Sequence, residues 1–294
     1  MKQSLLFLLL LWTAAASAQR PMMSDSLLIG GRARSFHYFE PEGPSRGFHL
    51  VFVLHGSGGN GKGMMPPLAR LEARASREKV LFVYPDGWGR YWNECRRYAT
   101  SPANLQDVNE GAFFEALIDH FASRYGTVKD YAFAVGLSGG GHMAYKLAMT
   151  LPRRFPAISA IVANLPDPSN LDCTPSGTPV SVLITNGTAD GVNPDGGGIM
   201  TINGASWGRV RSTWGSLDYW ARLAGYKGKP VAAAVPDPDP ANGQSVMRYT
   251  HRKGRRPEVT LLRVEGGDHA YPKDLDVFEE SWAFFKRALQ RMRK

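Results

Sequence analysis

Short, uninterrupted apolar runs that alternate with helical patterns limit what this chain can fold into. FHLVFVLHG (48–56) and KVLFVYPDG (79–87) are typical, since both are rich in branched and aromatic residues and end in glycine. Such runs predict strands that are buried on both faces, as in a parallel sheet. Strands of the same kind are predicted at 130–138, 157–165, 180–190 and 258–267, and a weakly alternating edge strand is predicted at 32–41.

Apolar residues with helical spacing fill the intervals between these strands. The clearest case is 106–126, where Phe113, Leu117 and Phe121 fall close to one stripe. Further helices are predicted at 68–78, 141–152, 214–226 and 276–292. Because strands alternate with helices, we predict an α/β class fold with a mostly parallel central sheet and helices on both faces.

Two stretches rich in glycine, proline and polar residues interrupt the alternation. We expect 193–212 to be a long loop near the ligand, and 235–257 to be a surface excursion with a hairpin at SVMRYTH (245–251).

The first 18 residues have the layout of a secretory signal peptide. Lys2 precedes an apolar run, and Ala16-Ser17-Ala18 supplies the small residues for cleavage after Ala18. We therefore expect 1–18 to be removed, 19–294 to form a single catalytic domain, and the product to be periplasmic or extracellular without a transmembrane anchor. An uncleaved anchor helix is the alternative.

Export changes how the two cysteines, Cys95 and Cys173, are interpreted. In an oxidising compartment a pair of cysteines usually closes, so a disulfide is predicted, with two free buried thiols as the alternative. Two cysteines without matching histidines do not make a metal site, and we expect no metal or cofactor.

The formal net charge is +9, and basic residues cluster in HRKGRR (251–256) and in the C-terminal tail. Such runs are usually solvated, although they could favour an anionic envelope surface. Because no nucleic-acid-binding motif accompanies them, nucleic acid is not expected as a partner.

The stretch AVGLSGGGHM (134–143) contains the motif G-x-S-x-G, with Ser138 at its centre. The motif follows a predicted buried strand and opens a predicted helix, which is the context of a nucleophile on a strained turn. A phosphate-binding loop would need a lysine after the glycines, and His142 stands there instead.

A serine becomes a nucleophile only when a base and an orienting acid accompany it. In α/β-hydrolases the chain order is serine, acid, histidine. Asp190 and His269 follow two late strands in that order, at the edge where active sites form. Asp195 and Asp268 are rival acids.

The oxyanion of such a site needs two backbone N–H donors. One is predicted at Gly139, directly after the nucleophile. The other is predicted at Ser57 in LHGSGGNG (54–61), where a plain glycine turn is the alternative.

Five stretches together resemble the secreted polyhydroxybutyrate depolymerase and feruloyl/acetylxylan esterase group of α/β-hydrolases: VLHGSGGNG, YPDGWGRYWNE, AVGLSGGGHMAYKLA, ITNGTADGVNPDGGG and VEGGDHAYP. The resemblance implies a secreted serine esterase acting on polymer or polymer-linked esters, with Ser138, Asp190 and His269 as its triad. It also implies substrate-binding roles for Trp92 and Asn93, beside which His55 is a further candidate.

The chain departs from the family pattern at Ser57, Asp268 and Tyr271, and at the Asn109-Glu110 pair. These departures bear on substrate preference more than on mechanism. An exported serine peptidase and a non-catalytic polysaccharide-binding envelope protein are the alternative functions. Trp88, Trp92 and Trp207 could form an aromatic platform for substrate or could belong to the core.

Overall fold

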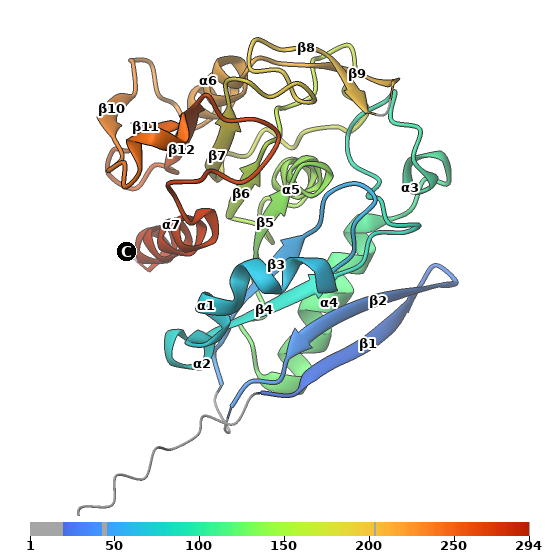
Figure 1. The fold of residues 1–294 in the computed structure, drawn as a ribbon. Coiled ribbons are helices and arrows are strands. Elements are labelled where there is room, and N and C mark those ends of the chain that lie inside the picture. The colour runs from blue at the N-terminus through green and yellow to red at the C-terminus, as the bar shows by residue number, and fades with distance from the viewer. Residues whose placement is uncertain (1–19, 43–45, 203, 294) are drawn as a thin grey trace, which may run out of the picture.

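The computed structural model describes residues 20–42, 46–202 and 204–293. The predicted signal peptide, 1–18, lies outside them, and the assignment of 19–294 to one catalytic domain stays a prediction. A ten-stranded sheet forms the centre of the described part, with helices on both faces (Figure 1). The predicted fold class is therefore confirmed. No helix among the described residues is both long and apolar enough to cross a bilayer.

The strands are β1 (Met22–Ile29), β2 (Arg32–Phe39), β3 (His49–Leu54), β4 (Val80–Pro85), β5 (Phe133–Leu137), β6 (Ala157–Ile161), β7 (Ser181–Gly187), β8 (Gly198–Ile202), β9 (Ala205–Val210), β10 (Val231–Ala234), β11 (Ser245–His251) and β12 (Val259–Glu265). The α-helices are α1 (Ala69–Glu72), α2 (Ala75–Glu78), α3 (Pro102–Leu105), α4 (Glu110–Tyr125), α5 (Gly139–Thr150), α6 (Thr213–Leu223) and α7 (Val277–Met292). Short 3-10 turns lie at Lys62–Met64, Pro66–Leu68 and Pro240–Asn242.

The large sheet has the strand order β1-β2-β4-β3-β5-β6-β7-β12-β11-β10. The strands from β4 to β12 in this order are parallel to one another, whereas β1–β2 and β11–β10 extend the two edges in antiparallel fashion. β8 and β9 form a separate hairpin. Because the central strands are parallel, their carboxyl ends meet at one edge of the sheet.

Two layers of helices explain why the central strands are apolar throughout. Alternate residues of β3 point to opposite faces: Phe52 and Leu54 pack in the layer that holds α4, α5 and α6, and Val51 and Val53 pack in the layer of α1, α2 and α7. All six residues of β3 are buried. Both faces of the sheet are therefore excluded from water.

The segment 193–212, expected as a loop, instead contains the β8–β9 hairpin, so this prediction was wrong. The hairpin is held from outside by Asn170, whose Nδ2 donates to the carbonyls of Trp207 (3.1 Å) and Arg209 (3.0 Å). Gly208, at φ +80°, lies so close to Asn170 that a Cβ would meet the amide at 2.4 Å. The glycines that suggested a loop permit this close contact between distant segments.

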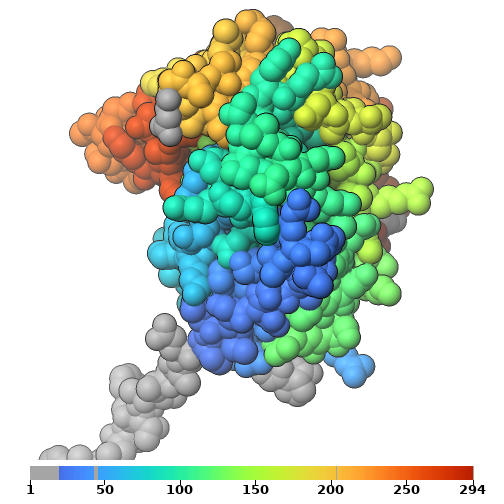
Figure 2. Space-filling model, turned by 90° about the vertical axis from the view of Figure 1, so that its right-hand side faces the viewer, coloured from blue at the N-terminus to red at the C-terminus, as the bar shows by residue number. Residues whose placement is uncertain are grey.

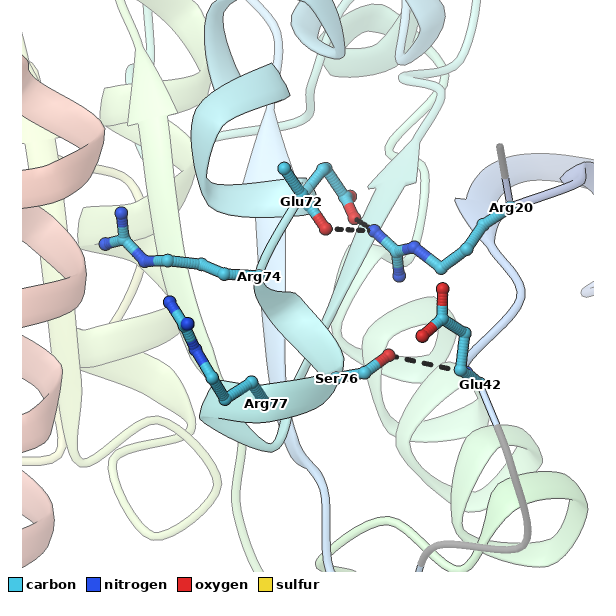
Figure 3. Close-up of a pocket in the computed structure, with 7 residues that line it drawn as sticks. Arg20, Glu42, Glu72, Arg74, Ser76 and Arg77 are labelled. Carbon is cyan, nitrogen blue, oxygen red and sulfur yellow. Dashed lines mark hydrogen bonds and ion pairs between the residues drawn. The ribbon is translucent and has the colours of Figure 1, made fainter. Parts of the chain in front are cut away.

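The helix predicted at 68–78 is divided into α1 and α2, each of four residues. Figure 3 shows what this region holds: the Arg20 guanidinium bonds the carbonyl and the carboxylate of Glu72, and Ser76 accepts from the backbone N–H of Glu42. The beginning of the described chain is thereby fastened to α1 and α2.

A disulfide joins Cys95 to Cys173, as predicted. Cys95 belongs to the long segment after β4, and Cys173 to the segment between β6 and β7. The bond closes a loop with a sequence separation of 78 residues. It links two irregular segments that lack ladder pairing in the large sheet.

Replacing both cysteines, in Cys95→Ala/Cys173→Ala, is expected to lower the free energy of unfolding by about 4 kcal/mol, because the unfolded chain regains the entropy of an open loop. Thermal unfolding of the variant, beside wild type with and without reductant, measures this loss. Reductant should lower the melting temperature of wild type and leave that of the variant unchanged. Equal melting temperatures for variant and oxidised wild type would contradict the prediction.

Asp86 connects β2 to the turn after β3. Burial raises the pKa of its carboxyl, but hydrogen bonds from His37 (3.0 Å), Ser35 (2.6 Å) and the Gly61 N–H (2.7 Å) outweigh burial and lower the pKa to about 2. Since these bonds favour the ionised form, their stabilisation is present above the ordinary value of 3.8 and is lost as the pH falls toward 2.

Asp86→Asn is therefore expected to lower the free energy of unfolding by about 2 kcal/mol at neutral pH, with the difference from wild type shrinking below about pH 4. Urea unfolding at a series of pH values measures the loss of unfolding free energy at neutral pH and the pH at which the difference from wild type shrinks. The exposed Asp130 supplies the control, since Asp130→Asn should follow wild type at every pH. A difference for Asp86→Asn that is independent of pH would refute the charge-based explanation.

Candidate active site

Ser138 stands at the junction of β5 and α5 with a backbone that few L-residues adopt, at φ 52° and ψ −114°. Its N–H donates to the Ile161 carbonyl (2.8 Å), and its carbonyl accepts from the His142 N–H (3.0 Å). The serine is therefore fixed as the N-cap of α5, with its side chain left out of capping. This is the geometry of a nucleophile on a strained turn.

The turn is possible because glycines let backbones touch. A Cβ on Gly136 would lie 2.1 Å from the carbonyl oxygen of Gly140, and a Cβ on Gly140 would lie 2.3 Å from that of Leu54. Side chains at these positions would push β3, β5 and α5 apart. The glycines two residues before and two residues after Ser138 therefore have a steric role.

A continuous hydrogen-bond path runs from Ser138 to His269 and on to Asp190. The His269 Nδ1–H donates to Asp190 Oδ2 (2.8 Å), because a carboxylate only accepts, and His269 Nε2 then accepts from Ser138 Oγ (2.9 Å). The three residues follow β5, β7 and β12, which end at the same edge of the sheet. The structure brings together the three residues that the sequence singled out.

Asp190 is held rigidly, with its side chain fully buried. Its Oδ1 accepts from the N–H groups of Val192 (2.8 Å) and Asn193 (2.7 Å), so the carboxylate is fixed before it meets His269. The rival acids lie elsewhere: Asp195 pairs with Arg263 (2.8 Å), and Asp268 is exposed.

The predicted oxyanion donors lie side by side next to Ser138. A Cβ on Gly139 would lie 3.1 Å from the backbone nitrogen of Ser57. Within the described part of the chain, neither amide donates a backbone hydrogen bond, and Gly139 occupies the first helical position, where N–H groups have no partner in the helix. Both N–H groups are thus free to bind a developing negative charge.

Trp92, Asn93 and His55 lie behind this site and not in open space. The Trp92 indole N–H donates to the His55 carbonyl (2.9 Å), and the two rings lie 4.9 Å apart. The His55 ring accepts from the Gly87 N–H (2.9 Å) and donates from Nδ1 to the Gly56 carbonyl (2.8 Å), while burial lowers its pKa. These contacts fix the oxyanion segment, and direct substrate contact by the three residues stays a prediction.

Asn93 is bonded on every side. Its side-chain amide donates to Asp107 (3.0 Å) and to the Val108 carbonyl (3.0 Å), and its backbone carbonyl accepts from Lys146 Nζ (2.6 Å). Its N–H reaches Glu110 (3.1 Å), one of the residues at which the chain departs from the family pattern. Asn93 therefore orders the segment that follows β4.

The three tryptophans suggested as a platform do not form one. Trp92 and Trp207 are buried, at 2% and 6% exposure, whereas Trp88 is partly exposed and donates to Gln106 (3.1 Å). The core interpretation holds for two of the three.

An arginine that the sequence did not single out fastens the β8–β9 hairpin to the segment after β4. Arg96 is fully buried, pairs with Glu94 (2.6 Å) and lies over the Trp207 ring, 5.0 Å from its centre. Tyr91 stacks on the same tryptophan, with centroids 6.1 Å apart. In Figure 2 the two segments (teal and gold) meet on one face. Nothing in the spacing of these residues predicts the contact.

His142 is the second residue that the sequence did not predict as part of the site. It lies one helical turn after Ser138, is 2% exposed, and neither ring nitrogen has a partner among the described residues. Burial, then the charges of Arg96 and His269, hold its pKa well below the usual range, so the imidazole is neutral. Its lowered pKa makes it a weak base, and it has no hydrogen bond to the Ser138 hydroxyl, which bonds His269 instead.

Among the described residues, no group of three or more His, Cys, Asp and Glu side chains is arranged to hold a metal ion.

The chain is similar to several known proteins that are named esterases. The chain is 24% identical over 268 residues to "Probable feruloyl esterase C" of Aspergillus niger, covering 88% of this chain and 86% of the relative. It is 31% identical over 170 residues to "Feruloyl esterase C" of Emericella nidulans, covering 55% of this chain and 57% of the relative. No family model matches the chain.

The fold is also found among solved structures. An acetyl xylan esterase from Aspergillus awamori superposes with a TM-score of 0.59 at 16% identity, covering 89% of this chain and 99% of the other. At 16% identity, this likeness is evidence for a shared fold alone. The solved structure therefore supports the α/β-hydrolase fold, and the sequence relatives support an ester hydrolase that resembles the feruloyl and acetylxylan esterases.

Proposed function

We propose that this chain is an exported serine esterase that hydrolyses feruloyl or acetyl esters carried by polysaccharides. Ser138 is the nucleophile, His269 the general base and Asp190 the acid that orients it. The observation that carries the proposal is the continuous hydrogen-bond path through these three side chains.

The first half of the reaction forms an acyl-enzyme. Ser138 Oγ attacks the ester carbonyl as its proton passes to His269 Nε2, and the oxyanion accepts from the amides of Ser57 and Gly139. The buried carboxylate of Asp190 stabilises the imidazolium that forms. His269 then gives the proton to the leaving alcohol.

The second half of the reaction hydrolyses the acyl-enzyme and releases the carboxylic acid product. Water donates a proton to His269 and attacks the acyl carbonyl, and the same two amides bind the second oxyanion. The proton returns to Ser138 Oγ, which restores the enzyme. No metal or cofactor has a step in this scheme.

The substrate class follows from the relatives and not from the triad, which any ester could use. The sequence relatives are named feruloyl esterases, and a solved structure of the same fold is an acetyl xylan esterase. The first name specifies a feruloyl ester, and the second an acetyl ester of a polysaccharide, xylan. Hydroxyalkanoate oligomers, which the family resemblance also implied, belong in the same panel of substrates.

Export is supported by two independent features. The first 18 residues have the signal-peptide layout, and the Cys95–Cys173 bond requires an oxidising compartment to form and persist.

Ser138→Ala is expected to lower kcat on p-nitrophenyl acetate, methyl ferulate and acetylated xylan by roughly 10⁵-fold or more, because the nucleophile is lost. Steady-state kinetics on purified protein measure this, with circular dichroism to verify the fold. A matched p-nitroanilide tests the peptidase alternative, which would require amides to be cleaved faster than esters.

Ser57→Ala is the matched control for this variant, since it removes a hydroxyl beside the site and keeps the backbone N–H that the mechanism uses. It should retain kcat within about tenfold of wild type. Ser138→Ala retaining a few per cent of the activity, or Ser57→Ala falling equally far, would sink the assignment.

Asp190→Asn is expected to lower kcat by roughly 10⁴-fold, because the amide no longer selects the His269 tautomer whose Nε2 accepts from Ser138. Asp195 is a neighbouring carboxylate that pairs with Arg263, and Asp195→Asn should keep kcat within about tenfold of wild type. Both variants are measured on the same ester. A larger loss for Asp195→Asn than for Asp190→Asn would reverse the choice of acid.

A further inference from the structure

A hollow lies between α6 and the β10–β11 edge of the sheet, which are neighbours in Figure 1. Its volume is about 610 Å³, within the range of roughly 300–1,000 Å³ that is usual for ligand sites. We call it the α6–β10 groove, and the residues that matter below are Trp214, Leu217, Lys229, Tyr249 and His251. None of them takes part in the chemistry at Ser138.

The apolar part of the groove is an aromatic pair, the exposed Trp214 and the half-buried Tyr249. Trp214 is 41% exposed, which is unusual for so large an apolar side chain, and it meets the Tyr249 ring edge-on with centroids 4.7 Å apart. Leu217 and Pro230 extend the same lining. An exposed indole ring suits the C–H face of a pyranose ring.

The groove starts at the catalytic edge of the sheet and runs away from it. Trp214 follows Thr213, whose hydroxyl accepts from Asn186 near the carboxyl end of β7 (3.1 Å). His251, by contrast, pairs with Val259 at the opposite end, where β12 begins. A polymer lying in the groove would therefore have one end directed to the edge that carries Ser138.

Exposed cations surround the far end of the groove. Two loops are joined there: the Lys253 N–H donates to the Tyr226 hydroxyl (3.1 Å), and the Arg256 guanidinium donates to the Gly225 carbonyl (2.6 Å) and lies over the Tyr226 ring. The exposed side chains of these loops, which we call the basic rim, are Lys227, Lys229, Arg252, Lys253, Arg255 and Arg256.

One acidic side chain lines the groove itself. Asp218 is paired with Arg222 on the next turn of α6 (2.6 Å), and it is a single acid against the six cations of the basic rim. The field at this end of the groove is positive, which favours an anionic ligand.

We propose that the α6–β10 groove and its basic rim bind an acidic polysaccharide, with a sugar ring stacked on Trp214 and uronic carboxylates paired with the rim. The proposal rests on the proposed function only in taking the carrier of the ester as the ligand. Stacking alone would fit a neutral glycan, and charge alone would fit any polyanion. The juxtaposition of the two selects a carboxylated sugar chain.

Affinity electrophoresis tests the proposal on the full mature protein, with glucuronoxylan in one gel and the same polymer after reduction of its carboxyl groups in another. Glucuronoxylan should retard wild type strongly, and the reduced polymer should do so weakly. Trp214→Ala and Lys227→Ala/Lys229→Ala should each raise the dissociation constant by about tenfold, and added salt should weaken wild-type binding.

Two control variants remove similar side chains elsewhere. Tyr98→Ala deletes another exposed aromatic ring, and Lys62→Ala/Lys129→Ala deletes two exposed charges. Neither should change the retardation. Trp214→Ala should also keep wild-type kcat/KM on p-nitrophenyl acetate, because the groove has no part in the chemistry.

The outcomes separate this proposal from the esterase assignment. Esterase activity without retardation by glucuronoxylan would overturn the groove proposal alone, and retardation without activity would overturn the esterase assignment alone. Equal binding of the carboxyl-reduced polymer would remove the acidic specificity. Tighter, Trp214-dependent binding of single-stranded DNA or of anionic phospholipid vesicles would replace polysaccharide with another class of ligand.

Discussion

The conformation of Ser138 depends on a contact between backbones. Its positive φ is maintained because Gly136 approaches the Gly140 carbonyl, and Gly140 approaches that of Leu54, at distances that leave no room for a Cβ. The same approach sets the Gly139 amide beside that of Ser57. One steric constraint therefore fixes Ser138 and sets the two proposed oxyanion donors side by side, and both donors are backbone amides that need no flexible side chain.

The parallel sheet brings residues that are far apart along the chain close together in space. β5, β7 and β12 deliver Ser138, Asp190 and His269 to one edge because parallel strands share the direction of their carboxyl ends. Asp190 needs further support, since a buried carboxylate is stable only when its oxygens are bonded. The amides of Val192 and Asn193 supply that support, and the acid is held rigidly before His269 approaches it.

The sequence predicted those parts whose pattern is local. Central strands such as β3 are apolar on both faces and stand out, and the motif around Ser138 follows from glycine spacing. β1 and β10 escaped prediction because they are mostly exposed and carry no such pattern. The β8–β9 hairpin escaped because Asn170 holds it from a distant segment. Arg96 and His142 also escaped prediction, because their importance depends on their burial, and the spacing of residues in the sequence does not indicate which polar side chains are buried.

The segments that surround the site have little ladder pairing of their own, so other links must fix them. The disulfide and the buried Glu94–Arg96 pair hold the segment after β4, and Arg96 extends that order to the hairpin through Trp207. A buried ion pair that loses one partner leaves an uncompensated charge. Changing Glu94 would thus disturb both segments together, whereas changing Trp214 would affect the groove alone. The proposed positioning of the ester and the proposed retention of its polymer therefore depend on separate parts of this fold.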